Sequence, residues 1–437
     1  MSDMPHRLAK APAGTAFLAS RAGLVAIWLG FVGLRLAAIC LPVRPTSDAE
    51  FYFTRAAQLA GGLGYLANNG APTAFWPPGL SMALSVAFRL GGASPLTVGV
   101  FNLAAACLGG WLTYDLGRRL FGGELAGRIA LALLAVYPNS IFYVPLALTE
   151  VFYTTLLLGG CWLLITRQSW AAQAAAGLVF GLASLVKAQS LLVVPLVFAI
   201  LWLRGGDVWR RLAPLVGRGC LVVACALAVV APWSLRNLHE LHHFVLVSTN
   251  GGFTLLTGNN DEARGTYTPD AAIVKAIDRQ VGRTDEVAYD AATRRAGSQW
   301  IAAHPARFAA LAPLKLFRLW GPDGEAEWAY EGGYAGYARH AGLAHGLRLA
   351  NQAYYLALMA GFALAGALAL RGRWRARARL VDWWLLPYAI AAYPSLIAVV
   401  FSGQSRFHYP VMPFVCMACG WLLAGWRKNL AARPGPV

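Results

Sequence analysis

The chain has 437 residues, of which 58% are hydrophobic and only 13% are charged, whereas soluble domains carry about 25% charged residues. Its formal net charge is +17, but the basic residues stand in short clusters between apolar runs, the pattern of cytoplasmic membrane loops. This distribution argues against a soluble globular protein and against a nucleic-acid partner. The clusters are Arg118-Arg119, residues 204–218, residues 371–379 and Arg427-Lys428.

Apolar runs of about 20 residues recur along the chain and predict an all-α polytopic membrane protein with about 10–12 transmembrane helices. A short basic tail, with Arg7 and Lys10, precedes a first span that lacks a convincing signal-peptide cleavage site. The run at 80–90 is too short to cross and predicts a re-entrant or interfacial helix. An even number of full spans places both termini on the same side of the membrane, which we expect to be the cytoplasmic side. The ten full spans expected are residues 21–41, 96–116, 129–148, 151–166, 172–186, 191–203, 220–235, 347–370, 383–401 and 411–426.

Two polar loops face the far side of the membrane. The first, residues 42–77, contains a predicted helix from Asp48 to Ala60 that glycines terminate. The second, residues 236–346, contains a segment at 303–320 in which Arg307, Lys315 and Arg318 alternate with apolar residues, which predicts an amphipathic helix on the membrane surface. We therefore expect a transmembrane catalytic module at 1–235, a periplasmic loop region at 236–346 and C-terminal membrane helices with a cytoplasmic tail at 347–437.

The seven cysteines all lie in or at the ends of apolar runs, so the sequence shows neither a disulfide framework nor a cysteine metal site. Unusual polar residues instead gather at the outer ends of the predicted spans. Polar groups at membrane depth are costly unless they are paired or functional, so their convergence predicts an active site. These residues are Asp48, Glu50, Tyr52, Glu150, Lys187, Gln189, Arg236, Asn237, Asn259, Asn260, Arg406 and His408.

The residue types suggest a chemistry. A carboxylate at the outer face can deprotonate a hydroxyl, and nearby cations can stabilise a phosphate leaving group. The sequence has no Walker-type phosphate loop and no Rossmann fingerprint after a strand, so no soluble nucleotide cofactor is indicated. A phosphate donor carried by a lipid and reached from within the bilayer fits better.

Eight short motifs follow one another along the chain. They are Ser47-Asp48-Ala49-Glu50-Phe51-Tyr52, Ala74-Phe75-Trp76-Pro77-Pro78-Gly79, Leu116-Gly117-Arg118-Arg119-Leu120-Phe121-Gly122, Leu148-Thr149-Glu150, Val186-Lys187-Ala188-Gln189, Pro232-Trp233-Ser234-Leu235-Arg236-Asn237, the ten residues 251–260, and Arg406-Phe407-His408-Tyr409-Pro410. In order and spacing they resemble the membrane-embedded GT-C glycosyltransferases, in the bacterial branch related to protein mannosyltransferases and aminoarabinose transferases. The resemblance covers roughly residues 20–425.

The resemblance implies transfer of a sugar from a polyprenyl-phosphate carrier to an acceptor on the periplasmic face of a bacterial inner membrane, usually with inversion at the anomeric carbon. It implies that Asp48 is the catalytic base. The family's commonest pattern has adjacent acids or a second Asp, whereas Ala49 separates Asp48 from Glu50 here. The acceptor can be a glycan, a lipid or a protein. Asp48, Glu50 and Glu150 offer oxygen ligands for a divalent cation, although this branch often works without a metal.

The donor phosphate is expected to contact Lys187 and Arg236, with Arg406 and His408 as further ligands. Glu150 is expected to meet the acceptor or a metal, and Glu50 is expected to bind substrate. Tyr52, one turn after Asp48, is expected to orient the acceptor or the phosphate.

Each of these side chains also has a structural interpretation. Asp48 suits the first turn of a helix, and Ser47 with Glu50 forms a capping-box pattern that accounts for Glu50 without any catalytic role. Arg35, inside the first span, is better explained by structural pairing than by substrate contact. The remaining alternatives are an interfacial position for Tyr52, a helix cap for Glu150, snorkelling for Lys187, headgroup anchoring for Arg236 and turns for Arg406, His408, Asn259 and Asn260.

Two other functions compete with the transferase. A lipid-linked sugar flippase would place its ionisable residues near the bilayer midplane, often in paired repeats, and Arg35 is the one feature that favours it. An oligosaccharide ligase with a pyrophosphate-linked donor would use an outer turn containing Arg and His, such as the one at Arg406 and His408.

Overall fold

The computed structural model describes residues 13–205 and 208–431, and within these ranges the chain is helical without a β-strand. The α-helices are α1 (Ala13–Ala19), α2 (Arg21–Ile39), α3 (Asp48–Ala60), α4 (Gly79–Gly91), α5 (Pro95–Leu120), α6 (Glu124–Ala135), α7 (Pro138–Phe142), α8 (Thr149–Thr166), α9 (Trp170–Val186), α10 (Val193–Leu203), α11 (Val208–Leu241), α12 (Gly251–Gly258), α13 (Ala272–Gln280), α14 (Glu286–Ala303), α15 (Pro305–Trp320), α16 (Glu327–Gly333), α17 (Ala341–Arg375), α18 (Leu386–Val400) and α19 (Met412–Ala431). Short 3-10 helices are η1 (Ala188–Leu192), η2 (Ala338–His340), η3 (Trp383–Leu385) and η4 (Ser405–Val411).

Seven helical segments of the described chain are long and apolar enough to cross a membrane. They are Arg21–Ile39, Pro95–Leu120, Thr149–Thr166, Leu212–Leu241, Ala338–Arg375, Trp383–Val400 and Ser405–Gly425. The polytopic all-α fold is therefore confirmed. The structure does not confirm the expected ten full spans, because three of the ten apolar runs form helices that are shorter than a full span.

The expected span at 129–148 is interrupted in its middle. Helix α6 ends at Ala135, and Tyr137 takes an extended conformation (φ −69°, ψ 111°) before Pro138 begins α7. A residue that precedes proline is sterically driven out of the helical region, so the helix cannot continue there. The runs at 172–186 and 191–203 form the shorter helices α9 and α10, because the chain becomes extended at Lys187 (φ −139°, ψ 106°) between them.

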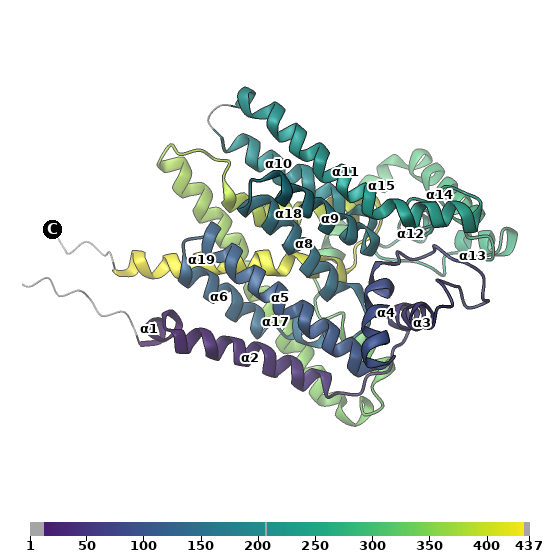
Figure 1. Ribbon diagram of the computed structural model, residues 1–437, viewed down its shortest axis with the longest axis horizontal. Helices are drawn as coiled ribbons and strands as arrows, with labels where there is room; N and C mark the ends of the chain where they lie inside the picture. Colours follow the sequence, from purple (N-terminus) through teal and green to yellow (C-terminus); the bar gives the residue numbers. More distant parts are fainter. Residues whose placement is uncertain (1–12, 206–207, 432–437) are drawn as a thin grey trace, which may run out of the picture.

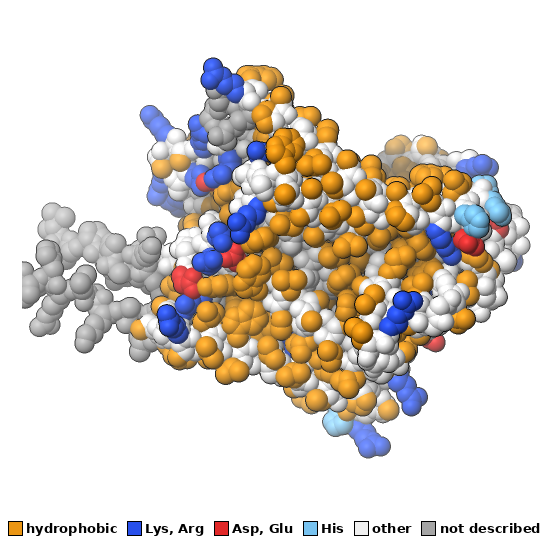
Figure 2. Space-filling model, viewed as in Figure 1, with side chains coloured by type: hydrophobic (Ala, Val, Ile, Leu, Met, Phe, Trp, Pro, Cys, Tyr) orange, Lys and Arg blue, Asp and Glu red, His pale blue; other side chains and the backbone are white. Residues whose placement is uncertain are grey.

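The long helices form one bundle, and the loops that carry α3, α4 and α12 to α15 lie together at one end of it (Figure 1). Helix α1 and the last turns of α19 lie at the opposite end. Two basic clusters also meet there, since Asp382 accepts from Arg204 at 3.2 Å and from Arg373 at 2.7 Å. Apolar side chains cover the middle of the molecular face and charged ones gather toward its ends (Figure 2), as a bilayer requires. The N-terminal tail with Arg7 and Lys10, and the side chains of Arg427 and Lys428, lie outside the described residues.

Helix α19 is the centre of the bundle, with Met412, Phe414, Val415 and Cys416 fully buried. It packs closely on α6, where a Cβ added at Gly420 would come within 2.5 Å of the Ala126 carbonyl oxygen. Membrane helices lack a hydrophobic drive to associate and rely on such close contacts through small residues. The turn η4, which carries Arg406 and His408, continues directly into α19.

The loop region at 236–346 has a small apolar core of its own, formed by Phe253, Leu256, Val274, Ile277 and Tyr289 among others. Helix α15 packs beside it and is amphipathic as predicted.

One residue of α15 corrects the expected orientation. Lys315 does not face the membrane surface but is fully buried, and its Nζ donates to Asn259 Oδ1 at 2.7 Å and to the Val399 carbonyl at 3.0 Å. It lies four residues from both Leu311 and Leu319, so it shares their buried face.

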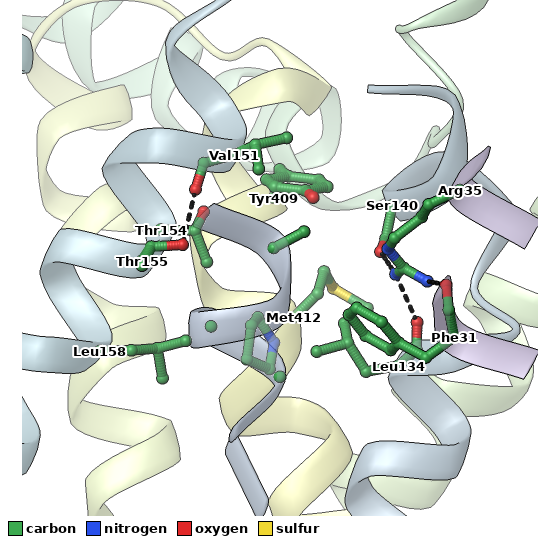
Figure 3. A pocket seen from close by; sticks show the side chains of 14 residues that line it. Phe31, Arg35, Leu134, Ser140, Val151, Thr154, Thr155, Leu158, Tyr409 and Met412 are labelled. Atoms are coloured by element: carbon green, nitrogen blue, oxygen red, sulfur yellow. Dashed lines mark hydrogen bonds between the residues drawn. The ribbon is translucent and has the colours of Figure 1, made fainter. Parts of the chain in front are cut away.

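Arg35 is buried inside α2 and hydrogen-bonds to neutral acceptors beside a cavity of about 30 Å³ (Figure 3). Its guanidinium donates to the carbonyls of Phe31, Leu134 and Ala135 at 3.0, 3.1 and 3.2 Å and to Ser140 Oγ at 2.5 Å. The last carbonyls of α6 have no partner within their own helix, so Arg35 satisfies groups that the break at Pro138 leaves free. Arg35 thus has the structural pairing favoured above, with carbonyls and a hydroxyl as its partners.

Candidate active site

Asp48 is the first residue of α3 and points to the interior, whereas Glu50 is exposed. The predicted capping box does not form. Ser47 makes no side-chain capping bond and has a φ of 53°, a conformation that non-glycine residues rarely adopt. Such strained backbone is often found at functional sites. Since residues two apart on a helix face different directions, only one of the two acids enters the site.

Arg406, in η4, joins two carboxylates that come from distant parts of the chain. Its Nη1 donates to Asp48 Oδ2 at 2.7 Å and its Nε to Glu150 Oε1 at 3.2 Å. Lys187 approaches the same Glu150 oxygen at 3.6 Å. The structure therefore brings together four of the predicted site residues, from α3, α8, the α9–η1 turn and η4.

These four side chains, which we call the charged tetrad, are mostly shielded from solvent. The Glu150 side chain is fully buried, whereas Lys187, Arg406 and Asp48 keep 12%, 15% and 26% of their side-chain surface exposed. Two carboxylates face two cations, so the group is neutral as a whole. Removing one member of a buried ion pair leaves an uncompensated charge, which makes the four residues interdependent.

Lys187 is held between aromatic rings, with Nζ at 5.4 Å from the centre of the Tyr153 ring and 5.2 Å from that of Phe407. Both distances are typical of cation–π contacts. The turn that carries Lys187 is also fixed from outside. A Cβ added at Gly79 would lie 2.7 Å from the carbonyl carbon and oxygen of Leu185, so only glycine allows the Pro77-Pro78-Gly79 segment to pack there.

Tyrosines border the acidic side of the site. Burial and then the Asp48 charge raise the pKa of Tyr52 well above its usual value, so its phenol stays protonated. Tyr267, in the outer loop region, is 38% exposed. Burial and the charge of Asp48 raise its pKa to about 12. Nothing in the sequence singles out Tyr267, because it lies in a polar loop far from any apolar run.

The loop at 321–326 fixes the turn that carries Arg406. Glu325 Oε2 accepts from the Arg406 backbone N–H at 2.8 Å and also from the Ser405 hydroxyl. Sequence reasoning missed this loop, since an acid in a long polar loop carries no distinguishing pattern.

His408 is placed differently from the expectation that it contacts the donor phosphate. Its ring is fully buried, with Nδ1 at 2.6 Å from the Leu319 carbonyl and Nε2 at 3.1 Å from Asp323 Oδ1. Asp323 also accepts from Tyr137 Oη and Asn139 Nδ2, both at 2.6 Å, and from Asn351 Nδ2 at 3.0 Å. Burial alone would raise the pKa of Asp323, but its bonds to His408 and Tyr137 lower it overall. His408 therefore anchors η4.

Arg236 also makes contacts other than those expected. Its guanidinium donates to the carbonyls of Thr73 and Tyr65 at 2.8 and 3.0 Å and lies 4.9 Å from the ring centre of Trp233. It holds the first outer loop against α11. Asn259 and Asn260 are buried and bond to the helical carbonyls of Leu255 and Leu256, as the turn interpretation requires.

The described residues contain no group of three or more His, Cys, Asp or Glu side chains that could hold a metal ion. The guanidinium of Arg406 lies between the two carboxylates of the site.

Comparison with known proteins gives a family match over part of the chain and a fold. Residues 76–235 match the family described as dolichyl-phosphate-mannose-protein mannosyltransferase. Comparison with curated proteins gave no match. The chain is similar to ArnT from Cupriavidus metallidurans in the apo state, with a TM-score of 0.56 and 15% identity over 96% of this chain and 62% of that one. It is similar to the oligosaccharyltransferase AglB from Archaeoglobus fulgidus, in complex with an inhibitory peptide and a dolichol-phosphate, with a TM-score of 0.55 and 14% identity over 97% of this chain and 52% of that one.

The chain thus spans less than two thirds of either solved protein, and at these identities the likeness is one of fold. The family match does not depend on this likeness of fold, and the matched residues include Glu150 and Lys187. The family match over residues 76–235 and the likeness of fold both agree with the resemblance of the motifs to the membrane glycosyltransferases that are related to protein mannosyltransferases and aminoarabinose transferases.

Proposed function

We propose that the protein transfers a sugar from a polyprenyl-phosphate carrier to an acceptor hydroxyl, with inversion, on the periplasmic face of a bacterial inner membrane. The observation that carries the proposal is the bridge from Arg406 to Asp48 and Glu150. It places a partly exposed carboxylate beside a cation at the outer end of the bundle. The match to a dolichyl-phosphate-mannose-dependent family and the complex of AglB with dolichol-phosphate support a lipid-linked donor.

In this mechanism the donor phosphate takes Arg406 and Lys187 as its counter-ions. Both cations now have carboxylate partners, so an entering phosphate competes for them and frees Asp48. Asp48 then accepts the proton of the acceptor hydroxyl while that oxygen attacks the anomeric carbon. The bond from the anomeric carbon to the phosphate oxygen breaks, and the carrier leaves as a phosphate monoester whose charge the two cations stabilise. A single displacement inverts the anomeric carbon.

The other predicted residues have supporting parts in the proposal. Glu150 holds Lys187 and Arg406 in place before the donor binds. Tyr52, protonated and buried, packs behind Asp48, and Glu50 remains outside the site. Arg236 and His408 are left out of the phosphate site, because their donors already bind the chain.

The test uses purified protein in lipid nanodiscs with a panel of undecaprenyl-phosphate sugars, each radiolabelled in the sugar. Donors and acceptors to try follow from the lipid and glycan profile of a deletion strain, which shows which glycoconjugate loses a sugar. We expect Asp48→Asn to lower turnover by a factor on the order of 10²–10⁴, the usual contribution of a general base.

The matched control is Glu50→Gln, which removes the neighbouring exposed acid and should leave turnover near that of the wild type. Undiminished turnover of folded Asp48→Asn protein would refute the base assignment. In sealed proteoliposomes, movement of intact donor between leaflets without release of undecaprenyl phosphate would instead support a flippase.

A further inference from the structure

A second pocket, distinct from the charged tetrad, lies between α16 and the first turns of α17. It has a volume of about 290 Å³, close to the lower limit of about 300 Å³ for pockets that bind small molecules. Its walls include the aromatic rings of Phe142, Tyr330, Tyr334 and Tyr337 and the side chains of Leu343 and Leu347. Such a lining favours a hydrocarbon ligand.

The pocket lies where the bundle meets the outer interface. Helix α17 has 35 residues and is therefore about 52 Å long, longer than the roughly 30 Å core of a bilayer. Its far end carries the basic cluster at 371–379, so its first turns stand at the outer boundary. Leu343 and Leu349 on these turns are 63% and 58% exposed, as expected of residues that touch lipid. Leu41, two residues after the end of the membrane span α2, also lines the pocket.

The rim of the pocket is basic. Arg348 and His340 line it, and the exposed Arg339 precedes His340 in the chain. Arg348 pairs with Glu327 at 3.0 Å but keeps 62% of its side-chain surface exposed. Figure 2 shows basic side chains projecting at the lower edge of the molecule, where Figure 1 places the start of α17. Basic groups at this level attract anionic headgroups.

We propose that this pocket holds an acyl chain of an anionic membrane lipid, whose headgroup binds Arg348 and Arg339. The proposal goes beyond the transfer reaction, because it assigns a ligand to a site that contains none of the four charged residues. The occupant is amphiphilic, since the apolar walls adjoin a positively charged rim, and it is a membrane lipid, since the neighbouring surface of α17 faces the bilayer.

The floor of the pocket connects this site to the reaction centre. Asn139, Gly324 and Asn351 line it, and both asparagines donate to Asp323. Asp323 in turn contacts His408 in η4, two residues after Arg406. A lipid in the pocket therefore packs against the same loop that positions Arg406 from its other side.

The test is photo-crosslinking with a phosphatidylglycerol that carries a diazirine in one acyl chain, compared with a phosphatidylcholine that carries the same group. Delipidated full-length protein is mixed with each probe, irradiated and digested, and labelled peptides are mapped by mass spectrometry. We expect labelling at 327–351 with phosphatidylglycerol at least fivefold above that with phosphatidylcholine. Ala344→Trp, which fills the pocket, should reduce this labelling at least fivefold, and Arg348→Gln should reduce the preference for phosphatidylglycerol.

The matched control is Leu349→Trp, on an exposed position of the same helix outside the pocket, which should keep wild-type labelling. Leu347→Trp repeats the filling test from another position if Ala344→Trp is not monodisperse. The proposal is overturned if the filled variants label as strongly as the control, if the label maps elsewhere, or if both lipids label the segment equally.

Discussion

Arg406 and Asp48 are 358 positions apart in the sequence, yet Nη1 of Arg406 donates to Oδ2 of Asp48 at 2.7 Å. The start of α3 and the turn η4 therefore close one site. In the proposed mechanism this ion pair is a resting state, because the guanidinium occupies the Asp48 carboxylate until another anion draws the cation away.

Arg406→Lys should reduce activity at least about 100-fold, although it keeps the positive charge. A lysine has a single ammonium group and cannot reach two carboxylates with the planar geometry of a guanidinium. Steady-state kinetics should show a higher KM for the donor together with a lower kcat. Arg307→Lys, in an exposed pair with Asp261, is the control and should behave like the wild type. Equal activity of both variants would show that charge alone suffices.

Glu150→Gln should destabilise the protein by about 3–5 kcal/mol, because it leaves Lys187 without its carboxylate partner. Replacing both residues, as Glu150→Gln with Lys187→Met, should cost less than the sum of the single changes. Thermal unfolding in detergent for the wild type, both single variants and the double variant measures this coupling. If the two changes are strictly additive, the contact of 3.6 Å between Lys187 Nζ and Glu150 Oε1 contributes nothing to stability.

Glu325→Ala should lower kcat about tenfold, because the backbone and hydroxyl donors of the Arg406 turn lose their shared acceptor. Glu325→Gln retains one carbonyl oxygen at this position and should recover much of the loss. Donor KM should change less than kcat, since Glu325 positions the turn without touching the donor. The exposed Glu331→Ala is the control; a loss in that variant, or no rescue by Gln, would argue for a general effect on folding.

Lys315 should make stability depend on pH in the alkaline range. Burial lowers the pKa of Lys315 from 10.5 to about 8 in the folded protein. Between these two values the unfolded chain binds more protons than the folded one, so stability rises with pH, by about 3 kcal/mol in total. Below pH 8 both states are protonated and this contribution is constant.

Unfolding temperatures measured from pH 7 to pH 10.5 test this dependence. Lys315→Met should abolish the rise and be the more stable protein at pH 7, whereas the exposed Lys275→Met should retain it. A rise of the same size in Lys315→Met would assign the dependence to other groups.

Hydropathy located every apolar run of the fold, because a bilayer imposes long apolar helices whatever their packing. It could not determine where those helices end. The break at Tyr137 follows from Pro138. The end of α6 that it leaves is capped by Arg35, which donates to the Ala135 carbonyl from 100 positions away in the chain. Lys187 takes its extended conformation two residues after Leu185, which packs against Gly79 from a distant part of the chain.

The candidate site was predictable to the extent that charge at a membrane boundary is unusual. Asp48, Glu150, Lys187 and Arg406 stand out on that ground, and the structure brings them together. Glu325 and Tyr267 lie in polar loops, where acids and tyrosines are common, so no local pattern marks them. The capping-box pattern at Ser47 was misleading, since that residue has a positive φ and makes no side-chain capping bond.

The burial of Glu150 has a consequence for how the protein is made. A chain is synthesised from its N-terminus, so Asp48, Glu150 and Lys187 enter the membrane well before Arg406 emerges from the ribosome. Until α19 is inserted, one cation has to serve two carboxylates. The three tetrad residues made first therefore have a net charge of −1 until the last helix is inserted, and that step both completes the site and neutralises it.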